Sequence, residues 1–60
     1  MSGAFETYQD RAGKYRWRLK DATGRVVATG EAYETKARAR KGCEAVVRAA
    51  VDATIVEVPA

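Results

Sequence analysis

The sequence predicts a small α+β domain of the β3-α-β kind, in which an antiparallel sheet carries one helix on one face. Three observations lead to this fold class. Apolar and cationic residues alternate over residues 15–20, as they do in a strand with one buried face. The segments 10–13 and 21–24 each begin with Asp and end with Gly, which is typical of turns between strands. Apolar residues then recur at helical spacing over residues 36–50.

The first strand is expected at residues 4–9, where Phe5, Thr7 and Tyr8 favour extended structure. Phe5 and Tyr8 are an odd number of residues apart, so either a bulge intervenes or one of the two rings faces away from the core. The segment 10–13 follows as the turn of a hairpin, because Asp bonds to its local backbone and Gly tolerates positive φ.

The second strand, at residues 15–20, has the clearest pattern in the sequence. Its apolar and cationic faces consist, respectively, of Tyr15, Trp17 and Leu19, and of Arg16, Arg18 and Lys20. The turn at 21–24 leads to a third strand at residues 26–29, whose β-branched residues favour extended structure. Together the three strands form an antiparallel meander.

One helix is expected at residues 36–50, with Thr35 as its N-cap. Its apolar face consists of Ala39, Cys43, Val46, Val47 and Ala50. Gly42 lies inside this helix at a cost of about 1 kcal/mol relative to alanine, which predicts a close contact between the helix and the sheet backbone. Residues 54–58 are predicted to form a final strand before Pro59, and this strand need not pair within its own subunit.

A chain of 60 residues makes a single domain, one repeat spanning residues 1–60, and its core is marginal at this size. The large side chains expected inside are Phe5, Tyr15, Trp17, Leu19, Val27, Val46, Val47 and Ile55. Because Cys43 is the single cysteine and histidine is absent, neither an intrachain disulfide nor a structural zinc site is available, and no cofactor is expected. Self-association remains, and pairing or exchange of the C-terminal strand would cover open sheet edges. We therefore expect a homodimer.

The composition places further bounds on the partners of the chain. No apolar run approaches the roughly 20 residues that a membrane-spanning helix needs, so no membrane contact is expected. The start of the chain lacks the basic and hydrophobic segments of a secretory leader, which predicts a cytoplasmic location. The net charge of +3 permits an anionic partner, but eleven basic residues are interspersed with eight acidic ones.

Several motifs, taken in order, span nearly the whole chain. They are Phe5-x-x-Tyr8, Gly13-x-Tyr15-Arg16-Trp17-Arg18-Leu19, Gly24 with Val27-Ala28, Glu31-x-Tyr33, Lys36, and Gly42-x-Glu44-x-Val46. Together they resemble the YegP-like family of small uncharacterised proteins. The resemblance implies a β3-α-β unit that occurs as tandem repeats or as a dimer of single repeats, with one shared sheet and swapped C-terminal strands.

This chain looks like the single-repeat form of that family. Thr23 departs from a frequent asparagine before the turn glycine, Thr29-Gly30 replaces a serine-rich pair, and Cys43 replaces a usual isoleucine. These departures affect at most the packing of the helix. The family brings no established activity, so no catalytic or binding residue carries over from it.

The residues themselves argue against an enzyme. No histidine is present as a tuned acid or base, the carboxylates are scattered, and no phosphate-binding glycine loop occurs. Cys43 lies on the apolar helical face and is interpreted as a core residue rather than a reactive thiol. Trp17 and Tyr15 are interpreted in the same way, rather than as platforms for stacking bases.

The cationic sheet face is the first candidate site. Its residues Arg16, Arg18 and Lys20, with Arg11, Lys14 and Arg25 nearby, have the charge to hold a phosphate backbone. The favoured alternative is a solvated face whose arginines pair across strands with Glu6, Glu31 or Glu57.

The start of the helix is the second candidate site, because Lys36 and Arg40, with Arg38 and Lys41, oppose the helix dipole there. Such a group attracts an anion, or it is simply relieved by Glu44 at helical spacing. Two functions remain. The favoured one is a small dimeric structural or protein-interaction module, and the alternative is a weak, sequence-independent binder of nucleic acid or another polyanion.

Overall fold

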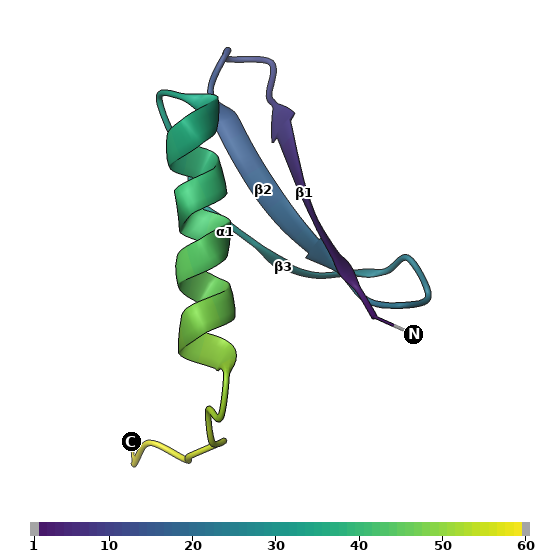
Figure 1. Cartoon of the computed structure of the whole chain (residues 1–60), viewed down its shortest axis with the longest axis vertical. Helices are drawn as coiled ribbons and strands as arrows, with labels where there is room; N and C mark the ends of the chain where they lie inside the picture. The colour runs from purple at the N-terminus through teal and green to yellow at the C-terminus, as the bar shows by residue number, and fades with distance from the viewer. Residues whose placement is uncertain (1, 60) are drawn as a thin grey trace.

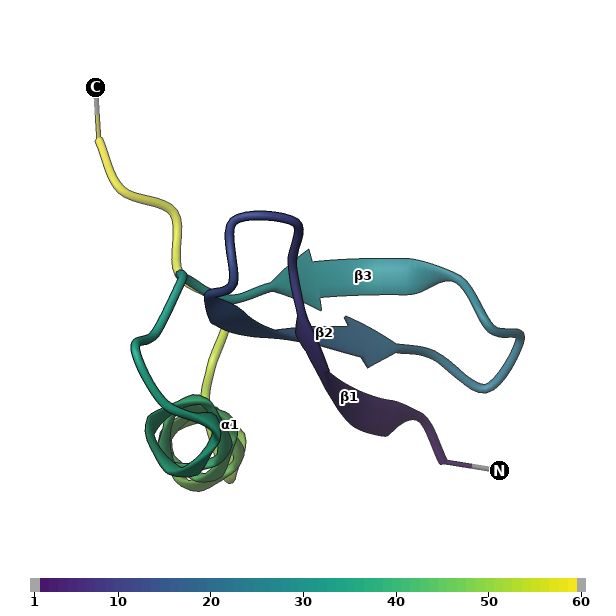
Figure 2. The ribbon, with the colours of Figure 1, turned by 90° about the horizontal axis from the view of Figure 1, so that it is seen from above.

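The computed structural model describes residues 2–59 and has one sheet and one helix. The strands β1 (Ala4–Gln9), β2 (Tyr15–Lys20) and β3 (Val26–Thr29) form an antiparallel sheet in the order β1-β2-β3. Helix α1 (Lys36–Ala50) packs against β1 and β2 (Figures 1 and 2). The α+β class and the bounds of all four elements are as the sequence predicts.

The hairpin turns form in the way that their aspartates predict. The Asp10 carboxylate accepts hydrogen bonds from the backbone N–H groups of Ala12 and Lys14, both at 2.9 Å. Gly13 closes this turn at a φ of 84°, a conformation that favours glycine. Asp21 and Gly24 repeat the arrangement in the second turn, with Gly24 at a φ of 90°. Both turns therefore fix the register of the strands that they join.

The aromatic side chains of β1 divide between the two faces of the sheet. Phe5 packs edge-on against Trp17 on the face that carries α1, with ring centroids 5.4 Å apart. Tyr8 lies on the open face, where the Arg18 guanidinium stacks 4.7 Å from the centre of its ring. No bulge is needed in β1, because its pairing with β2 is continuous from Ala4 to Gln9.

The helix begins at its expected cap and approaches the sheet closely at its middle. The Thr35 hydroxyl accepts a hydrogen bond from the Arg38 N–H at 3.1 Å. A Cβ atom on Gly42 would lie 2.8 Å from Cζ of Tyr33 and 3.2 Å from Nε1 of Trp17. The close contact predicted at Gly42 therefore exists, but it is made with two side chains rather than with the sheet backbone.

The core is smaller than the sequence predicts. Among residues 2–59 the buried apolar residues are Trp17, Ala39 and Cys43. Of the side chains expected inside, those that are half-buried are Phe5, Tyr15, Leu19 and Val46.

Three expected core residues are exposed, and each has its own physical reason. Val27 is 55% exposed because Ala28 is the residue opposite Leu19, which turns its neighbour to the open face. Val47 is 48% exposed because the helix diverges from the sheet there and leaves a groove between β1 and α1. Ile55 is fully exposed because it lies beyond the helix, in the segment 53–59 whose residues are all exposed.

The expected final strand at residues 54–58 is absent from the single chain. Residues 53–59 have no regular secondary structure, and all of them are exposed. Figure 1 shows this segment leaving the end of α1 and extending beyond the sheet. The prediction is wrong for the isolated subunit, because a strand requires a neighbouring edge and none lies within reach of this path.

Candidate functional site

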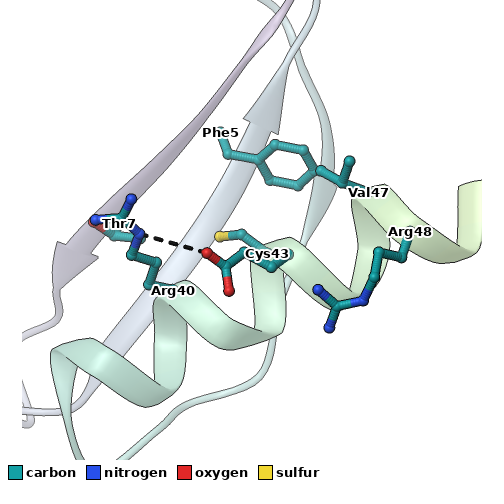
Figure 3. A pocket seen from close by; sticks show the side chains of 7 residues that line it. Phe5, Thr7, Arg40, Cys43, Val47 and Arg48 are labelled. Carbon is teal, nitrogen blue, oxygen red and sulfur yellow. Dashed lines mark ion pairs between the residues drawn. The ribbon is translucent and has the colours of Figure 1, made fainter.

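A groove between β1 and α1 has a cavity volume of about 630 Å³. It lies where the helix diverges from the sheet (Figure 3). Its lining residues all come from these two elements and are Phe5, Thr7, Arg40, Cys43, Glu44, Val47 and Arg48. Phe5, Cys43 and Val47 make its floor apolar, whereas both arginines are on the helix side.

The charges of the groove are only partly balanced. Nε of Arg40 lies 3.7 Å from the Glu44 carboxylate, as the dashed line in Figure 3 marks. Arg48, one helical turn further on, has no ion pair within residues 2–59. Burial raises the pKa of the Cys43 thiol above its usual range, so this sulfur stays protonated at neutral pH. The groove thus offers an apolar floor and a cationic rim, without a reactive thiolate.

A smaller cavity of about 220 Å³ lies beside the start of the helix. Its lining residues are Thr7, Tyr8, Gln9, Tyr15 and Lys36. Thr7, in the middle of β1, lines both cavities. The larger cavity extends from it towards Phe5 and the smaller one towards Gln9. Lys36 is one of the residues predicted to contact an anion, and this cavity is where the structure places it.

The open sheet face carries the cationic residues of β2, but an acid neutralises part of their charge. Nε of Arg18 donates to a Glu6 carboxylate oxygen at 2.7 Å, and Nζ of Lys20 lies 3.4 Å from the same oxygen. The hydrogen bond from Arg18, together with Lys20, holds the pKa of Glu6 below its usual range. Arg16 instead donates to the backbone carbonyl of Gly30 at 3.1 Å. Cross-strand pairing, the favoured interpretation of this face, is present at Glu6.

Other basic residues expected to extend the patch also have acidic partners. Lys14 pairs with Glu34, and this contact lowers the pKa of the Glu34 carboxyl group. Arg25 lies 4.0 Å from Asp21 within its own turn. Glu31 and Glu57, the other acids considered as partners of the sheet arginines, form no ion pair within residues 2–59.

The five residues predicted to contact an anion do not converge on one site. Arg16, Arg18 and Lys20 project from the open face of the sheet, whereas Lys36 and Arg40 belong to the helix on the other face. The sequence reasoning missed the groove itself. A signal for it was present, because Arg40, Glu44 and Arg48 are spaced by four residues and follow the same helical side as Cys43 and Val47.

Within residues 2–59, no cluster of three or more His, Cys, Asp or Glu side chains is arranged to hold a metal ion. The helix in the same range is too short and too polar to cross a membrane.

Comparisons with known proteins agree with the observed fold. Residues 10–57 match a family described as a domain of unknown function, DUF1508. A UPF0339 protein of Treponema denticola is 52% identical over 58 residues, which cover 97% of this chain and 100% of that protein. A UPF0339 protein of Stutzerimonas stutzeri, described as in the ptx operon 5' region, is 42% identical over 52 residues. That match covers 87% of this chain but only 47% of the relative.

A solved structure shows the same fold. The solution NMR structure of a protein from Haloferax volcanii superposes with a TM-score of 0.80 at 43% sequence identity, covering 95% of this chain and 97% of that one. Neither the family description nor the names of the relatives indicate a biochemical function. The motif-based resemblance to YegP-like proteins is confirmed, and the chain belongs to the DUF1508 family, whose relatives here are UPF0339 proteins.

Proposed function

We propose that this chain is a small self-associating module, a homodimer in which residues 54–58 of each copy complete the sheet of the other. It acts in the cytoplasm by binding a further protein, and it is not an enzyme. The observation that carries the proposal is the state of the C-terminal segment. Val51, Ile55, Val56 and Val58 all expose most of their side-chain surface, in a chain whose buried core within residues 2–59 consists of three residues.

The energetics favour covering this segment. Full burial of one Val or Ile side chain contributes about 1.5–3 kcal/mol, which is a large fraction of the stability of a domain this small. The segment also has the composition of a strand, with β-branched residues at 54–56 and at 58. The sheet order β1-β2-β3 leaves two edges on which such a strand can pair.

The relatives add support of a different kind. The Stutzerimonas stutzeri protein is about twice as long as the region that it shares with this chain, because the match covers 47% of it. A protein of that length has room for a second domain of the same size. A homodimer of the present chain would pair two such domains from two chains, whereas the longer protein has room for both domains in one chain.

Fewer observations support the alternative function, a polyanion binder. Glu6 offsets the charge of Arg18 and Lys20, and the helix residues Lys36 and Arg40 lie on the opposite side of the sheet. Arg16 is the member of the β2 stripe with no acidic partner within residues 2–59. A phosphate backbone bound at this face would therefore have to displace Glu6 from its two partners.

Sedimentation velocity on the full chain and on a variant that ends at Ala53 tests the proposal. We expect the full chain to sediment as a dimer, at twice its monomer mass of 6.5 kDa, and the shortened variant as a folded or partly folded monomer. A full chain that remains monomeric at all concentrations up to the millimolar range would contradict the proposal.

A further inference from the structure

We infer that the side of α1 that faces away from the sheet binds an acidic helix of a partner protein. The residues that carry this contact are Arg38, Lys41, Ala45 and Arg48, which together form the outer stripe of the helix. The inference rests on the proposed function, in which the chain binds a further protein, and it names the surface and the chemistry of that partner. The distribution of charge, the free basic side chains and the geometry of the helix support it.

The positive charge of the chain is concentrated on α1. Lys36–Ala50 holds five of the eleven basic residues and one of the eight acidic ones, which gives the helix a net charge of +4. The rest of the chain has six basic and seven acidic residues, a net charge of −1. An anionic partner that is attracted by the field of the chain is therefore attracted to the helix.

The acidic side chains near the helix leave the outer stripe with its charge. Glu44, the single acid of α1, lies 3.7 Å from Nε of Arg40. Arg38 lowers the pKa of Glu34 through its charge, but the ion-pair partner of that carboxylate is Lys14. Within residues 2–59 the three basic residues of the outer stripe thus form no ion pair.

The outer stripe is accessible because of its position on the helix. Its members follow one another at steps of three, four and three residues, so they lie along one side of α1, and all four are exposed. Ala39 and Cys43, which are buried, and Val46, which is half-buried, lie on the opposite side. Figure 2, which looks along α1, shows the sheet on one side of the helix only. Strand pairing extends a sheet in its own plane, so the proposed dimer leaves this stripe free.

The shape of the outer stripe fits a second helix. At a rise of 1.5 Å per residue, Arg38 and Arg48 lie about 15 Å apart along the axis. Carboxylates at the same steps on a partner helix can therefore meet all three basic residues. Ala45 in the stripe, with Ala37 and Ala49 exposed beside it, presents a methyl group where a long side chain would hold a second helix away.

The composition of α1 favours a protein over nucleic acid as this partner. Phosphate oxygens in nucleic acid complexes accept hydrogen bonds from Arg and Lys and also from Ser, Thr, Asn and Gln. Lys36–Ala50 contains none of the latter four residue types. The apolar surface of its exposed alanines contributes to a contact with a protein and offers no donor to a phosphate.

Titration of the ¹⁵N-labelled full chain with a synthetic acidic helix tests the inference. The probe is a capped peptide of alanine and glutamine with glutamates at steps of three, four and three residues, and the control peptide distributes the same glutamates around the helix. We expect the probe to shift the amide signals of α1 and to bind about fivefold more tightly than the control peptide.

Two double variants test the residues. Lys41→Gln with Arg48→Gln removes two charges from the outer stripe, and Arg11→Gln with Arg25→Gln removes two exposed charges from the hairpin loops. Glutamine has a helix propensity close to that of Lys and Arg, so α1 should persist. We expect the first pair to weaken binding of the probe by about fivefold or more and the second by less than about twofold.

Four outcomes would overturn the inference. Equal losses in the two double variants, or equal binding of the two peptides, would show that net charge alone attracts the probe. Signal shifts confined to the sheet would place the contact elsewhere. Tighter binding of a short mixed-sequence DNA strand than of the probe, at the outer stripe, would assign this surface to nucleic acid.

Sedimentation velocity on the same samples separates this inference from the proposed self-association. A monomeric chain that binds the probe at the outer stripe would refute self-association and support the inference. A dimer that does not bind the probe there would refute the inference and leave self-association intact.

Discussion

Replacement of Gly42 by alanine sets two effects of similar size against each other. In the middle of a helix, alanine is favoured over glycine by about 1 kcal/mol. Against this, the new Cβ atom would lie 2.8 Å from Cζ of Tyr33 and 3.2 Å from Nε1 of Trp17, and it would overlap the Tyr33 hydroxyl group. Overpacking of this kind typically costs about 1–3 kcal/mol.

The neighbours of Gly42 have little freedom to move. Trp17 is 6% exposed, and the backbone of Tyr33 is held to Tyr15 by two hydrogen bonds of 2.7 and 2.8 Å. We therefore expect the overpacking cost to exceed the gain in helix propensity. The free energy of unfolding of Gly42→Ala should fall by about 1 kcal/mol, which lowers the Tm of a domain this size by about 4–8 °C.

Thermal and urea unfolding at one fixed protein concentration measure this effect, because self-association makes apparent stability depend on concentration. Tyr33→Ala supplies the control, since it removes the ring that meets the new Cβ atom. In that background Gly42→Ala should be less destabilising or stabilising. If Gly42→Ala stabilises the otherwise unchanged chain, the close packing between the helix, Tyr33 and Trp17 is not as described.

Three other predictions follow from individual contacts. The lowered pKa of Glu6 means that its contacts with Arg18 and Lys20 stabilise the fold above about pH 4.5 and lose that effect as the pH falls through the lowered pKa. Urea unfolding at neutral and acid pH should show less loss for Glu6→Gln, and an unchanged pH dependence would refute this role. Thr35→Ala should destabilise the chain by about 1 kcal/mol through loss of the helix N-cap, whereas an unchanged unfolding midpoint would argue against the cap. Mixed DNA and RNA fragments should leave the size of the protein unchanged at low salt. A larger species that dissociates at high salt, and that is lost in the Arg16→Glu, Arg18→Glu double variant, would instead establish polyanion binding.

The sequence predicts the local structure well because local chemistry decides it. The alternation of apolar and cationic residues from Tyr15 to Lys20 is typical of a strand, and a strand forms there. The carboxylate of each turn aspartate accepts hydrogen bonds from nearby backbone N–H groups at the predicted place. Thr35 caps the helix through the backbone N–H of the third residue after it, as an N-cap threonine does in most helices. None of these features depends on distant parts of the chain.

Burial and the site depend on how the elements meet, which periodicity does not determine. The irregular register beside Leu19 turns Val27 to the open face, although its composition is that of a core residue. The angle at which the helix leaves the sheet opens the groove at Val47, and nothing in the helix sequence specifies that angle. The candidate anion contacts are separated by the thickness of the sheet for the same reason. Only the pairing of Arg18 with Glu6 was accessible from strand pairing rules.

The structure of the C-terminal segment, residues 54–58, also depends on tertiary contacts that its sequence does not determine. Its composition predicts a strand, but whether a strand forms depends on an edge that the single chain does not bring to it. The prediction fails for the isolated subunit, and the proposed dimer supplies the missing edge.

The most direct test of the account is an isotope-filtered NMR experiment on a mixed sample, in which half of the chains carry ¹³C and ¹⁵N labels. We predict nuclear Overhauser contacts between residues 54–58 of one copy, including the Ile55 methyl groups, and an edge strand, β1 or β3, of the other copy. A spectrum of the dimer without contacts between copies at these residues, or with Ile55 contacts confined to its own chain, would contradict the account.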